Sequence, residues 1–120
     1  MPPLGEHGHR AERVGDLIRQ ELALLLKREV KDPRVGFVTI TRVEVTRDMR
    51  TARVGVSVLG DAQQKKDSLT GLAAAQGFLR HELAQRLGLR HTPALQFRID
   101  ESLQEESRIE ELLRQIKEKP

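Results

Sequence analysis

The chain has 120 residues, which is enough for one domain around one hydrophobic core and too few for a second. It contains no cysteine, so disulfides, thiolate catalysis and cysteine-based zinc sites are excluded. The formal net charge is +3, with 17 Lys and Arg against 12 Asp and Glu in residues 1–100 but 4 against 6 in residues 101–120. The basic surface therefore belongs to the body of the protein.

The N-terminal residues show no signal sequence, and no apolar run approaches the roughly 20 residues that a membrane span needs. We therefore expect a cytoplasmic protein that does not associate with membranes. A flexible tail is expected over residues 1–9 and a single domain over residues 10–117.

The first element in chain order is an amphipathic helix expected from Arg10 to Lys31. Its apolar residues recur at three- and four-residue steps, which places them on one helix face. They are Val14, Leu17, Ile18, Leu22, Leu25, Leu26 and Val30. The helix should stop at Lys31-Asp32-Pro33, because the residue before a proline is pushed out of the helical region.

Two strands are expected next, joined as a hairpin. The segment 36–46 is rich in β-branched residues, but its alternation slips, so we expect a bulge near Thr41-Arg42 or burial on both faces. Residues 47–50 form a turn. Residues 52–58 alternate cleanly between apolar and polar positions and complete the hairpin.

A helical region is expected from Ser68 to Leu87, with Ser68 as its N-cap and Gly88 at its C-terminal cap. Glycine destabilises a helix by about 1 kcal/mol relative to alanine. We therefore expect a kink at Ala75-Gln76-Gly77 that divides the region into two shorter helices.

After Pro93, an alternating segment containing Leu95, Phe97 and Ile99 predicts a third strand. A capping box of Ser102 and Glu105 then predicts a C-terminal amphipathic helix. The order helix, strand, strand, kinked helix, strand, helix is typical of an α+β fold with a three-stranded sheet and its helices on one face.

No catalytic or metal-binding signature is found. His7 and His9 lie in the expected tail and make a poor metal site, while His81 and His91 sit beside arginines as surface residues or phosphate contacts. The carboxylate pairs lie on the expected last helix, and no serine has a nucleophile-elbow context. We expect no catalytic residues, no metal and no cofactor.

The arginines and lysines are the more informative set. Each alone is more often a solvated charge than a contact, but together they can line a surface that follows phosphates, since guanidinium makes two parallel hydrogen bonds to a phosphate. Tyrosine and tryptophan are absent, so RNA binding would depend on backbone charge and RNA shape rather than on base stacking.

Several segments resemble bacterial ribosome-binding factor A. In the first half these are Glu29 to Arg34, Thr39-Ile40-Thr41 and Val43 to Met49. In the second half they are Ala75 to Arg80, Leu89-Arg90 with Pro93 and Leu95, and Asp100-Glu101-Ser102 with Arg108-Ile109. The segments are collinear and span about residues 10 to 113. One departure is Glu106, where family members often carry glycine.

The resemblance implies a type II KH-like domain in which an alanine-centred kink, here Ala75, replaces the usual Gly-x-x-Gly loop. It also implies a non-catalytic assembly factor that binds free or immature small (30S) ribosomal subunits, assists maturation and processing of 16S rRNA, and matters in the cold. Other assembly factors are possible further partners, and a monomer is expected. With the basic set above, the predicted RNA-binding residues are Arg10, Arg13, Lys31, Arg34, Ala75, Gly77, Arg80, Arg86 and Arg90.

Two other classes of function remain as alternatives. A small phosphate-handling enzyme could use an arginine cradle, but it would need a nucleophile or base that the sequence does not identify. A protein-interaction module could dock a partner on a strand edge or on the last helix.

Overall fold

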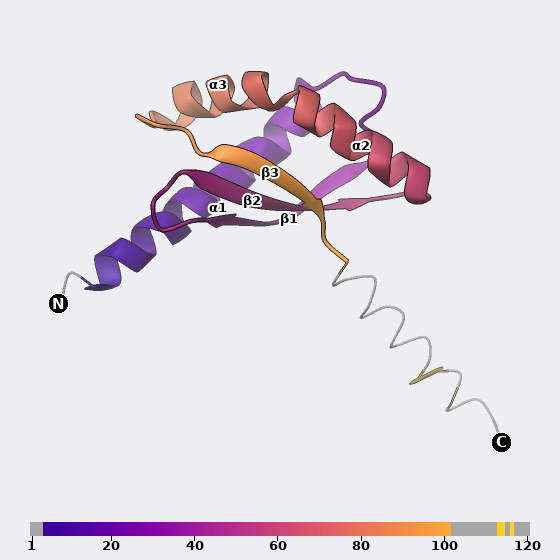
Figure 1. Cartoon of the computed structure of the whole chain (residues 1–120), viewed down its shortest axis with the longest axis horizontal. Helices are drawn as coiled ribbons and strands as arrows, with labels where there is room; N and C mark the ends of the chain where they lie inside the picture. The colour runs from indigo at the N-terminus through magenta and orange to yellow at the C-terminus, as the bar shows by residue number, and fades with distance from the viewer. Residues whose placement is uncertain (1–3, 102–112, 115, 117–120) are drawn as a thin grey trace.

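The computed structural model describes residues 4–101, 113, 114 and 116, and begins with helix α1 (Leu4–Arg28) (Figure 1). The helix starts earlier than the expected Arg10, so it extends into the segment expected to be a tail. The division of the chain at residue 10 stays a prediction. The helix ends at Arg28, before the expected Lys31. Just beyond Arg28, the N–H groups of Glu29 and Val30 both donate to the Leu25 carbonyl.

Strands β1 (Val38–Val45) and β2 (Thr51–Val58) form the expected antiparallel hairpin. The register shifts between Ile40 and Arg42, which confirms the predicted bulge. The bulge explains why the alternation of apolar and polar residues slips, because it places two residues of one strand opposite one residue of the other.

The helical region after β2 is divided as predicted, with α2 (Ala62–Ala74) and α3 (Gln76–Leu87) meeting at Ala75. Gly88 ends α3 in the left-handed conformation, at φ 63°. The predicted N-cap at Ser68 is wrong. Asp61 caps α2 instead, in a capping box with Gln64 that our sequence analysis missed.

Strand β3 (Ala94–Ile99) pairs in parallel with β2, so the sheet order is β1-β2-β3. A parallel partner needs a crossover connection, which α2 and α3 supply. The resulting order, α1-β1-β2-α2-α3-β3, is the one expected for a type II KH-like domain. The predicted C-terminal helix from Ser102 lies largely outside the described residues.

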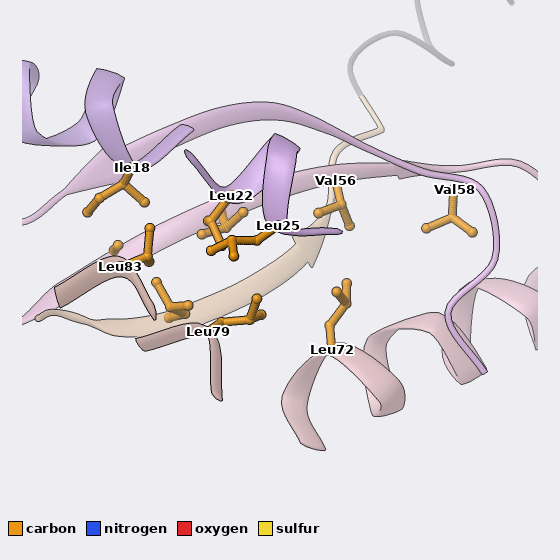
Figure 2. Close-up of a cluster of buried hydrophobic side chains, with 11 residues drawn as sticks. Ile18, Leu22, Leu25, Val56, Val58, Leu72, Leu79 and Leu83 are labelled. Carbon is orange, nitrogen blue, oxygen red and sulfur yellow. The ribbon is translucent and has the colours of Figure 1, made fainter. Parts of the chain in front are cut away.

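The core lies between the sheet and one layer of helices, and it is aliphatic as expected. Figure 2 shows leucines of α1 and α3 and Leu72 of α2 pointing toward valines of β2. Every described helix in this layer contributes side chains to the same cluster: Ile18, Leu22, Leu25, Leu72, Leu79 and Leu83. The helices therefore cover one face of the sheet, and the polar residues that alternate with the core valines point to the other.

Candidate nucleic-acid interface

The kink between α2 and α3 is built around Ala75. Its N–H donates to the carbonyls of Gly71 and Leu72, and its own carbonyl accepts from Leu79, so it belongs to both helices. No side chain caps the start of α3. Gly77 is exposed, and a Cβ added there would meet nothing within 4 Å among the described residues. The first turn of α3 is therefore open to an approaching ligand.

The loop after α1 lies against α2, one turn before the kink. A Cβ added at Gly71 would come within 2.7 Å of the Val35 side chain and 3.3 Å of the Arg34 Cβ, so this position needs glycine. The buried Ser68 hydroxyl holds the same loop, since it accepts from the Gly36 N–H at 3.3 Å and donates to the Arg34 carbonyl at 3.4 Å. The predicted residue Arg34 is thereby placed one turn before the kink, while Lys31 is exposed in the loop that leads to it.

Arg34 is held by Asp32. Its Nε lies 3.0 Å from Oδ1 and its Nη2 2.6 Å from Oδ2, so one edge of the guanidinium is occupied while Nη1 faces away from this pairing. These hydrogen bonds lower the pKa of Asp32 to about 2 and raise that of Arg34. Asp32 therefore fixes the position of a charge that remains partly exposed to solvent.

A second group of basic side chains lies on α3 and in the loop between α3 and β3. Arg80 donates to the Thr92 carbonyl at 2.8 Å, and Arg90 and His91 are exposed beside it. The Gln76 side chain accepts from the Leu95 N–H at 2.9 Å, which ties the kink to the start of β3.

The hairpin turn adds two arginines that the sequence analysis treated only as part of a turn. The Ala94 N–H donates to the Arg50 carbonyl at 2.8 Å, so the turn carrying Arg47 and Arg50 adjoins the loop that enters β3 (Figure 1). Because β2 and β3 pair in parallel, this turn and the loop that carries Arg90 lie at the same end of the sheet. We name this surface the basic end, formed by Arg47, Arg50, Arg80, Arg90 and His91.

Asp48 shapes the turn of the basic end. It accepts from the Thr46 hydroxyl at 2.7 Å and from the Arg50 N–H at 3.0 Å, and these bonds lower its pKa below the ordinary 3.8. Met49 adopts the left-handed conformation, with φ 64°. The carboxylate is thus used within the turn, which leaves the exposed arginines on either side as the outward charges.

Three of the remaining predicted residues lie elsewhere. Arg10 and Arg13 are exposed on α1, outside the ion pairs found among the described residues. Arg86 instead joins α3 to α1, with Nη2 at 2.6 Å from Glu29 and further carboxylates of Glu21 and Glu82 at 3.8 and 3.6 Å. Its charge is offset by these carboxylates, and its role in RNA binding stays a prediction.

The described residues contain no group of three or more His, Asp or Glu side chains arranged to hold a metal ion. Within that same part of the chain, no helix combines the length and hydrophobicity needed to cross a bilayer.

The family model for ribosome-binding factor A matches residues 10–113. The chain belongs to the ribosome-binding factor A family. Its curated relatives include ribosome-binding factor A of two Desulfitobacterium hafniense strains, DSM 10664 / DCB-2 and Y51. Each is 48% identical to this chain over 110 residues, covering 92% of this chain and 88% of the relative.

Solved ribosome-binding factor A structures share the fold. The match to the crystal structure from Thermus thermophilus covers 74% of this chain and 94% of the Thermus thermophilus chain, with a TM-score of 0.66 at 24% identity. A second match is to the solution NMR structure of a Thermotoga maritima protein described as a ribosome-binding factor A. It covers 79% of this chain and 87% of the Thermotoga maritima chain, with a TM-score of 0.60 at 34% identity. These matches confirm the expected α+β, KH-like fold.

A third match is to a homology model of ribosome-binding factor A. This homology model of the Thermus thermophilus factor was fitted into a cryo-EM map of a 30S complex of that protein. The match covers 71% of this chain and 93% of the Thermus thermophilus chain. The TM-score is 0.55 at 25% identity.

Proposed function

We propose that this protein is a non-catalytic ribosome assembly factor that binds free or immature 30S subunits. It assists late maturation and processing of 16S rRNA, a step that becomes most demanding in the cold. It acts in the cytoplasm as a monomer, without cofactor or metal.

The basic end is the observation that carries this proposal. Four arginines and one histidine from α3, the hairpin turn and the loop entering β3 converge at one end of the sheet. The chain has no tyrosine or tryptophan to stack on single-stranded bases, so this surface suits phosphates and RNA shape. A member of the same family forms a complex with the 30S subunit.

The action follows from selective binding. A factor shifts an rRNA equilibrium only as far as it prefers one state over another. We propose that the basic end holds an rRNA segment in one conformation by neutralising phosphates that come close together only in that conformation. Maturation then proceeds from the selected state.

The test is co-sedimentation with purified small subunits. The double variant Arg47→Glu/Arg90→Glu should bind more weakly than the wild type, with a flatter dependence of affinity on salt, because fewer counterions are released. The matched control is Lys65→Glu/Lys66→Glu on α2, which makes the same charge change away from the basic end.

Equal weakening in the two double variants would mean that net charge, not the basic end, drives binding. Salt-insensitive binding that both variants retain would favour the alternative of a protein-interaction module. A wild-type protein that stays at the top of the gradient, with normal rRNA in a strain lacking the gene, would contradict the proposed function.

A further inference from the structure

The face of the sheet opposite the helices carries a row of residues centred on a glycine. By strand register Gly55 of β2 lies between Arg42 of β1 and Arg98 of β3. Partners on neighbouring strands point to the same face, and neighbouring strands lie about 4.8 Å apart. The glycine therefore leaves a gap between two arginines whose backbones are about 10 Å apart.

This gap is a hollow of about 280 Å³, close to the lower end of the volumes of small-ligand sites, roughly 300 Å³. Arg53, two residues before Gly55 on the same strand, adds a third guanidinium to its lining. The glycine is required, since a Cβ there would lie 2.8 Å from the Thr41 hydroxyl and 3.0 Å from the Arg42 Cγ.

Two carboxylates, Asp100 and Glu44, also line the hollow, and by strand register Glu44 of β1 lies opposite Arg53 of β2. Asp100 accepts from the Thr41 hydroxyl at 2.6 Å and lies 3.8 Å from the Arg42 Nε, so it holds one wall in place. Neither Arg53 nor Arg98 forms an ion pair with another described residue, and both are exposed. The lining has three cations against two anions, which favours an anionic ligand.

The hollow lies a short way along β2 from the basic end. Arg50 ends the hairpin turn and Arg53 lies three residues further along the chain, about 10 Å at the rise of a strand. An RNA backbone that contacts the basic end is therefore within about 10 Å of Arg53 along the strand.

We infer that the uncovered face of the sheet is a second part of the RNA interface, in which Arg42, Arg53 and Arg98 around Gly55 bind phosphates of the RNA that also contacts the basic end. This inference rests on the proposed function. It assigns RNA to the side of the sheet away from the kink.

The first test compares salt dependence of binding to immature 30S subunits. Arg53→Gln/Arg98→Gln should lower the slope of log affinity against log salt by about 1 for each arginine. Arg47→Gln/Arg90→Gln at the basic end should do the same, and Lys65→Gln/Lys66→Gln on α2 should leave the slope unchanged.

A second variant leaves the charge of the lining unchanged and alters only the shape of the hollow. Gly55→Ala should weaken binding several-fold, because the new Cβ displaces Arg42 and Thr41. Gly36→Ala is the matched control, since a Cβ there would lie 3.9 Å from its nearest neighbour among the described residues, an ordinary contact. Circular dichroism of each variant establishes that it is folded.

The chain lacks cysteine, so a single introduced thiol can carry a tethered iron chelate that cleaves nearby RNA. Gln96→Cys, in the same cross-strand row as Arg53, should cleave 16S rRNA in the bound subunit, as should His91→Cys at the basic end. Lys66→Cys serves as the control. The inference would be overturned if rRNA were cleaved from position 91 but not from position 96, and if Arg53→Gln/Arg98→Gln left the slope of log affinity against log salt unchanged. That result would leave the proposed function standing. Absence of wild-type binding would overturn both.

Discussion

Arg34 shows how a single neighbour decides whether a surface arginine has a defined position. Asp32 takes the Nε and Nη2 edge of its guanidinium, and the Arg34 N–H also donates to the same carboxylate at 2.9 Å. A guanidinium held along one edge still presents Nη1 to a phosphate. The arginine is thus ordered before any ligand arrives, which reduces the entropy lost on binding.

The first prediction concerns the pKa of Asp32. In Arg34→Gln it should rise from about 2 toward the ordinary 3.8, because the main hydrogen bonds to the carboxylate are lost. Carbon-detected NMR titration of the Asp32 carboxyl measures this directly. Arg90→Gln, which removes an arginine elsewhere, should leave the midpoint unchanged. An equally low midpoint in Arg34→Gln would show that the loop backbone, not the guanidinium, lowers the pKa.

The pH range of this contact follows from the same shift. The pKa of Asp32 is lower in the folded state, so the contact contributes stability that is fully present above the unfolded pKa of about 3.9. That contribution is lost as the pH falls through about 2. The pairing of Asp32 with Arg34 is therefore complete at neutral pH.

At the scale of elements, α2 begins earlier than the predicted start at Ser68, because a capping box at Asp61 determines where the helix begins. The Asp61 side chain accepts from the Gln64 N–H at 2.8 Å, and the Gln64 side chain accepts from the Asp61 N–H at 2.7 Å. Two N–H groups at the helix start are satisfied in this way. Ser68 does not cap the helix. It is buried, and its hydroxyl holds the loop after α1.

The second prediction tests this boundary. Asp61→Ala should lower the free energy of unfolding by about 1 kcal/mol, as is typical for loss of an N-cap side chain. Urea unfolding followed by circular dichroism measures the change. Lys66→Ala, an exposed position on the same helix, is the control and should stay within about 0.5 kcal/mol of the wild type. A similar loss in both variants would contradict the cap.

At the scale of the whole molecule, Arg86 connects two helices that are distant in sequence. Its guanidinium lies among Glu21, Glu29 and Glu82, on α1, just beyond α1 and on α3. The side chains are partly exposed, and exposed ion pairs contribute about 0–1 kcal/mol each. The arrangement favours a role in holding α1 against α3 over a role as a phosphate contact.

The third prediction separates these two roles. Arg86→Gln should destabilise the protein by about 1 kcal/mol while leaving the salt slope of small-subunit binding unchanged. Arg90→Gln should do the reverse, with little loss of stability and a slope lowered by about 1. Urea unfolding and subunit binding at several salt concentrations measure both quantities. A lowered slope in Arg86→Gln would restore Arg86 to the RNA interface.

Local features were predictable from the sequence because they depend on neighbours along the chain. The apolar periodicity of α1, the bulge near Thr41-Arg42, the break at Ala75 and the cap at Gly88 are all set within a few residues. Backbone sterics and side-chain periodicity act over that range. The α+β class follows from the order of such elements, and the capping box at Asp61 was equally local but was overlooked.

Only the tertiary structure decided which charges come together. Arg47 and Arg50 join Arg90 because β2 and β3 pair in parallel, and Arg42 faces Arg98 across Gly55 because the bulge and the strand register align them. Arg86 lies among glutamates because α3 packs on α1. Charge on a surface has no periodicity that specifies a distant partner, so strand register and helix packing determine which arginines can share one ligand.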